Sequence, residues 1–136
     1  MASAHNLSLT ITSLLTILFG ILHLADDISR GVSPAGLTNL TVIFVLALWL
    51  YATLALVERR SGQVVILVMS FLISGVPVIH MLGRSGIAGS ASAGSVRAFF
   101  FAATLLALGG TAICSVILSL RGLWSLRRGR APQANA

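Results

Sequence analysis

Four long apolar stretches alternate with short polar ones along the 136-residue chain. They cover about residues 7–25, 37–57, 63–83 and 98–120. Each is close to the roughly 20 residues that a helix needs to cross a hydrocarbon layer about 30 Å thick. Because backbone groups in lipid must be hydrogen-bonded within the segment, each stretch is predicted to be a helix. The pattern therefore predicts an all-α integral membrane protein, a bundle of four transmembrane helices.

The composition supports a membrane protein over a soluble one. Hydrophobic residues make up 57% of the chain and charged residues 9%, and a soluble domain of this size needs a larger charged surface. The net charge of +6 could indicate nucleic-acid binding. The arginines, however, cluster at the ends of the apolar stretches instead of forming a basic stripe on a soluble face. We therefore expect the lipid bilayer as a partner and no nucleic acid.

The distribution of arginines predicts the orientation of the bundle. One end has Arg59, Arg60, Arg121, Arg127, Arg128 and Arg130, and the other has Arg30, Arg84 and Arg97. Arginine-rich short loops stay in the cytoplasm, so the N- and C-termini are both predicted to be cytoplasmic, in a bacterial inner membrane. The chain then divides into one membrane domain, residues 1–123, and a basic cytoplasmic tail, residues 124–136.

Polar residues gather at the outer end of this predicted bundle. His23, Asp26 and Asp27 are spaced i, i+3 and i+4, so all three are expected on one face of the first helix. His80 lies about one turn before the outer end of the third stretch, at the depth of His23. The segments "GILHLADD" and "PVIHMLGR" align with one histidine on the other. The two histidines are therefore predicted to meet.

This His/Asp cluster suggests a metal site. Two histidines and a carboxylate are a common ligand set for zinc or non-haem iron, and they leave a coordination position open. The predicted ligands are His23, Asp27 and His80, with zinc or iron as the candidate metal.

A second hypothesis needs no metal. A histidine polarised by a carboxylate could act as a general base on a lipid-like ligand. Arg84 and Arg97 could then hold the phosphate or carboxylate head group of that ligand. Asn39, at the outer start of the second stretch, belongs to the same layer. The predicted ligand-binding set is His23, Asp26, Asp27, His80, Arg84 and Asn39.

The alternative is a non-catalytic structural or assembly subunit in which the same residues clasp the helices. So small a bundle exposes much surface to lipid, so a homo-oligomer or a place in a larger membrane complex is also expected. The sequence leaves both the enzyme and the non-enzyme hypotheses open.

Three further expectations concern residues outside the cluster. Cys114, the only cysteine, is predicted to be a small core residue. Phe99 to Phe101 are expected to form an aromatic belt at the outer interface. Below Thr12 and Ser70 the stretches are expected to offer little polar character besides Glu58 at the far end, which disfavours a channel or transporter.

Overall fold

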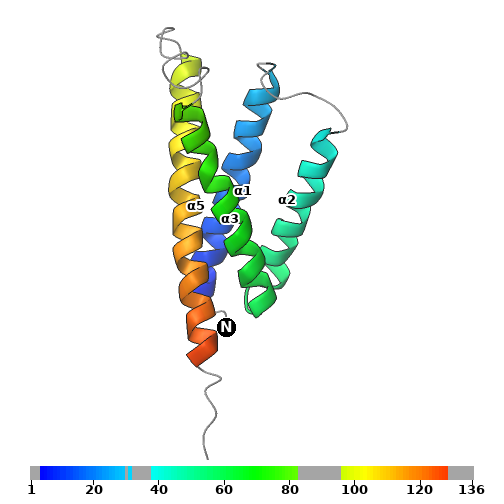
Figure 1. The fold of residues 1–136 in the computed structure, drawn as a ribbon, viewed down its shortest axis with the longest axis vertical. Coiled ribbons are helices and arrows are strands. Elements are labelled where there is room, and N and C mark those ends of the chain that lie inside the picture. Colours follow the sequence, from blue (N-terminus) through cyan, green and yellow to red (C-terminus); the bar gives the residue numbers. More distant parts are fainter. Residues whose placement is uncertain (1–3, 30, 32–37, 83–95, 129–136) are drawn as a thin grey trace, which may run out of the picture.

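The computed structural model describes residues 4–29, 31, 38–82 and 96–128, and these form four helices (Figure 1). They are α1 (Ala4–Ser29), α2 (Thr38–Ala55), α3 (Arg60–Leu82) and α5 (Val96–Arg128). The described residues contain no strand. The predicted all-α bundle is confirmed.

The lengths of the helices separate α2 from the other three. Segments Ala4–Ser29, Arg60–His80 and Phe99–Arg128 are long and apolar enough to cross a membrane, whereas the apolar part of α2, Leu40–Ala55, is shorter. At 1.5 Å per residue, the 18 residues of α2 extend about 27 Å, just under the thickness of a hydrocarbon core. The predicted second span is therefore present as a helix but is the shortest of the four.

The surface of the helices is apolar. Large hydrophobic side chains such as Phe44, Phe71 and Leu106 are exposed on α2, α3 and α5, and Leu18 is exposed on α1. A surface this rich in exposed apolar side chains suits lipid and not water. The composition of the helices thus indicates a membrane protein.

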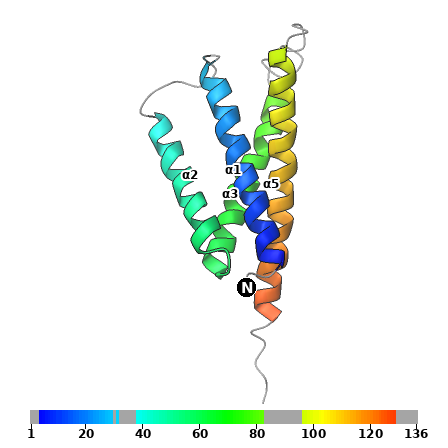
Figure 2. The ribbon, with the colours of Figure 1, turned by 180° about the vertical axis from the view of Figure 1, so that it is seen from behind.

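Helix α5 packs along both α1 and α3, whereas α2 contacts its neighbours far less. In both views α2 diverges from α1 and α3 toward its N-terminal end (Figures 1 and 2). Helices α3 and α5 approach closely at Gly109, where a Cβ atom would lie 3.1 Å from Cγ of Pro77, a tight contact. Gly110 has no such neighbour within 4 Å. Of these two adjacent glycines, Gly109 therefore lies at the contact between α3 and α5.

A closed set of hydrogen bonds fastens α2 to α1. The indole N–H of Trp49 donates to Oγ of Ser13 at 2.9 Å, and Thr53 donates from Oγ1 to the carbonyl of Trp49 at 2.9 Å. The remaining contact, 2.8 Å between the Ser13 and Thr53 hydroxyls, therefore has Ser13 as its donor. All three side chains are buried. The network thus adds buried polar contacts to the limited packing of α2.

Ser13→Ala is expected to destabilise the protein by about 1–2 kcal/mol, because it leaves the buried N–H of Trp49 without an acceptor. Ser8→Ala is the matched control. The Ser8 hydroxyl is exposed and bonds only to the carbonyl of Ala4 within α1. The free energy of unfolding in detergent is measured for both variants. Equal losses of stability would show that the network does not hold α2 against α1.

Two predictions about individual positions are wrong. Cys114 is exposed on α5 and is not a core residue. Polar residues below Thr12 and Ser70 are also not limited to Glu58, since Thr53, Gln63, Ser115 and Ser119 are buried nearer the opposite end. Thr53 donates to the carbonyl of Trp49, and the Ser115 hydroxyl lies 3.5 Å from that of Thr16. The buried Ser119 hydroxyl has no hydrogen-bond partner among the described residues.

The proposed division into a membrane domain and a tail is not visible as a break in the helix. Helix α5 continues through residue 124 to Arg128, and residues 129–136 lie outside the described part of the chain. The boundary between residues 123 and 124 stays a prediction.

Candidate metal site at one end of the bundle

Helix α1 carries His23 into the bundle on a line of small and polar residues. Thr16, Gly20, His23 and Asp27 recur every three or four positions, so they share one face of the helix. Thr16 and His23 are buried, and only 4% of His23 is exposed. Gly20 leaves room for the neighbouring helices, since a Cβ atom there would lie 2.9 Å from Cδ1 of Ile73.

Helix α3 brings His80 to the same end of the bundle. The two helices run to this end together, as Figure 1 shows, and the Nε2 atoms of His23 and His80 lie 3.1 Å apart. The rings meet edge to face, with their centroids 4.7 Å apart. At this distance one Nε2 atom donates and the other accepts. The predicted meeting of the two histidines is thus seen in the structure.

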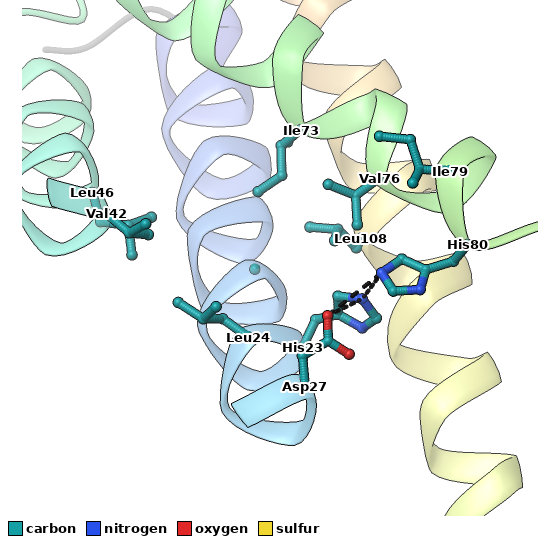
Figure 3. Close-up of a pocket in the computed structure, with 11 residues that line it drawn as sticks. His23, Leu24, Asp27, Val42, Leu46, Ile73, Val76, Ile79, His80 and Leu108 are labelled. Carbon is teal, nitrogen blue, oxygen red and sulfur yellow. Dashed lines mark hydrogen bonds and ion pairs between the residues drawn. The ribbon is translucent and has the colours of Figure 1, made fainter. Parts of the chain in front are cut away.

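Asp27 completes the cluster one helical turn beyond His23. Its Oδ2 atom lies 3.7 Å from Nε2 of His23 and 3.5 Å from Nε2 of His80, and Figure 3 shows the three side chains converging. Asp27 and His80 are largely buried as well. The carboxylate therefore faces both imidazole rings at once.

The three separations match one face of a coordination tetrahedron. Ligand atoms bound at roughly 2.0–2.2 Å to one zinc ion lie roughly 3.3–3.6 Å apart at the tetrahedral angle. The observed separations of 3.1, 3.5 and 3.7 Å bracket this range. Among the described residues, His23, Asp27 and His80 form the group that could hold a metal ion. Such an ion would retain a fourth position for a further ligand.

Phe101 of α5 forms an apolar wall beside the two histidines. Its ring centroid lies 5.3 Å from that of His23 and 5.6 Å from that of His80. Only 3% of Phe101 is exposed, against 71% for Phe99 and 61% for Phe100. The predicted belt is therefore wrong for Phe101. Phe101 belongs to the stripe of α5 that the structure buries, together with Leu105, Leu108 and Ala112.

A pocket of about 270 Å³ adjoins the cluster. All four helices contribute to its lining, which is mostly apolar, and His23, Asp27 and His80 supply its titratable groups. Figure 3 shows Val42 and Leu46 of α2 across the pocket from the histidines. The divergence of α2 thus leaves space beside the cluster for a small apolar or amphipathic molecule.

No family model, curated protein or solved structure matches the chain. The chemistry of the site is accordingly inferred from its geometry alone.

Of the other residues predicted for the site, the structure describes the side chain of Asp26, which lies outside this cluster. Asp26 contributes to a different pocket, which Phe19, Phe100 and Thr104 also line between α1 and α5. Consecutive residues point about 100° apart on a helix, so Asp26 and Asp27 cannot both face His80. Arg84 and the side chain of Asn39 lie outside the described residues, and their roles stay predictions.

Proposed function

We propose that this protein binds a divalent transition metal ion, zinc or iron, through His23, Asp27 and His80. The observation that carries the proposal is the set of three facing donor atoms from two helices, separated by 3.1, 3.5 and 3.7 Å. Two imidazoles and one carboxylate suit either metal. Burial beside Phe101 supports the proposal, because it removes water that competes for the ligands.

The open coordination position would adjoin the apolar pocket. A bound ion there could polarise a water molecule or a donor group of a ligand. The pocket lining of Gly20, Leu46, Ile73 and Leu108 favours a ligand with an apolar body. A small lipid-like molecule that presents an oxygen or nitrogen atom to the metal fits both parts of the site.

The site is proposed to face the outer side of a bacterial inner membrane. The start of α1, the connection from α2 to α3 and the end of α5 lie at the end opposite the histidines (Figure 1). The arginines of this opposite end outnumber those of the histidine end by six to three, which favours the cytoplasm for it.

Metal analysis of the purified protein tests the proposal. Wild type, isolated in detergent without chelators, is expected to contain nearly one zinc or iron ion per chain. The His23→Ala/His80→Ala variant is expected to contain none. His5→Ala is the control, because His5 lines a pocket at the opposite end. Metal that is absent from all three proteins, even after incubation with each ion, would overturn the proposal.

A structural clasp is the second candidate, and the direct contact between His23 and His80 favours it. This contact joins α1 to α3, and Asp27 faces both rings. A clasp predicts that the double histidine variant unfolds at a clearly lower temperature than wild type in metal-free buffer. A metal site without a clasp predicts that wild type and the double histidine variant unfold at similar temperatures in metal-free buffer. Added ion should then raise the unfolding temperature of wild type only.

A further inference from the structure

Helix α5 is longer than a membrane span and projects from the bundle at the end opposite the histidines. Its 33 residues extend about 50 Å, against roughly 30 Å for a hydrocarbon core. Its last two turns carry Trp124, Arg127 and Arg128. Tryptophan and arginine are the residue types that anchor helices among lipid head groups. This part of α5 is therefore expected at the membrane interface.

A groove between α3 and α5 ends at these residues. It has a volume of about 770 Å³ and is lined by Leu67, Leu120, Leu123, Trp124, Arg127 and Arg128. This volume lies within the range of small-molecule sites, roughly 300–1,000 Å³. The lining along α5 changes from leucine through tryptophan to arginine toward its C-terminal end. An amphipathic molecule with an apolar chain and a negative head group matches this order.

The positive end of the groove is arranged to receive an anion. The guanidinium carbon of Arg128 lies 4.9 Å from the centroid of the Trp124 ring. Stacking on the ring limits the freedom of the guanidinium, while its N–H groups remain able to bond a phosphate. None of the six lining residues is acidic, so no carboxylate of the lining neutralises the two arginines.

We infer that this groove binds an anionic phospholipid, with the phosphate on Arg127 and Arg128 and an acyl chain along Leu67, Leu120 and Leu123. The inference goes beyond the metal site and does not depend on it, because the two lie at opposite ends of the bundle. Each basic residue near an anionic lipid contributes roughly fivefold in affinity. The two arginines together are expected to contribute about 30-fold.

Native mass spectrometry in detergent tests this inference with two probes of identical acyl chains, phosphatidylglycerol and phosphatidylcholine. Wild type is expected to retain phosphatidylglycerol in preference to phosphatidylcholine. The Arg127→Gln/Arg128→Gln variant is expected to lose most of that preference. Arg59→Gln/Arg60→Gln is the matched control, because it removes the same charge near the same end of the bundle without altering the groove. It should behave as wild type.

A third variant tests the apolar part of the groove. Leu120→Trp adds bulk to the lining without a change of charge and is expected to weaken retention of phosphatidylglycerol severalfold. Helical content and unfolding temperature confirm that each variant is folded. Equal losses in the two arginine variants, equal retention of both lipids by wild type, or full retention by Leu120→Trp would each overturn the proposed site.

Discussion

Asp27→Ala is expected to lower the affinity for zinc at least about 100-fold, whereas Asp26→Ala retains wild-type affinity. The Asp27 carboxylate is the only acidic group of the cluster and lies within 3.7 Å of both Nε2 atoms. Removing even an outer-shell partner of a metal ligand costs 10–100-fold, so loss of a ligand itself should cost at least as much. Asp26 is the neighbouring residue and the same chemical type, yet it lines another pocket.

Competition with a chromophoric zinc chelator, in detergent at fixed pH, measures both affinities. The pair of variants separates ligation from electrostatic attraction, because each removes one negative charge from the same turn of α1. Equal losses would mean that the charge of this turn, and not a bond from Asp27, attracts the ion. Unchanged affinity in Asp27→Ala would remove the carboxylate from the proposed site.

Gly62→Ala is expected to destabilise the protein by about 3 kcal/mol. A Cβ atom on Gly62 would overlap the carbonyl group of Leu56 and lie 2.6 Å from its Cβ atom. The obstacle is backbone and not a mobile side-chain end, and the turn is held by hydrogen bonds from Leu56 to Ala52 and from Arg59 to Leu56. The connection between α2 and α3 must therefore shift to admit the methyl group.

Gly75→Ala provides the control within the same helix. A Cβ atom on Gly75 meets no heavy atom within 4 Å, and alanine favours a helix over glycine by about 1 kcal/mol. This variant is expected to be as stable as wild type or slightly more stable. Unfolding by heat or by denaturing detergent measures the stability of both glycine variants. A Gly62→Ala protein as stable as Gly75→Ala would show that the turn does not hold Gly62 against Leu56.

The common level of His23 and His80 could be predicted, because it depends on depth alone. Their direct contact also depends on how α1 and α3 are rotated toward each other. Each histidine lies about one turn from the outer end of its apolar stretch, and helices that cross the same layer bring such positions to one level. The membership of Asp27 follows from its i+4 spacing. The exclusion of Asp26 could not be predicted, because the i+3 and i+4 positions both lie near His23 on α1. Only the position of His80 on α3 shows which of the two carboxylates faces both histidines.

The burial of Phe101 and the exposure of Cys114 were beyond prediction from hydropathy. Only scattered hydroxyl residues interrupt the apolar residues of α5 through its membrane segment, and they form no continuous polar face that would identify the side that meets lipid. The structure selects the side by packing α5 against α1 and α3, with Gly109 against Pro77. The network of Ser13, Trp49 and Thr53 likewise depends on how α2 is rotated toward α1.

The four helices of the described residues and the levels of His23 and His80 could be predicted from the amino-acid pattern. These depend on the length and hydropathy of each stretch, which are properties of one segment. The rotation of each helix and the separation between helices follow from packing in the folded bundle. In lipid, apolar side chains suit the interior and the surface of a bundle equally. The rotation that aims His23, Asp27 and His80 at one another is therefore set by contacts between helices.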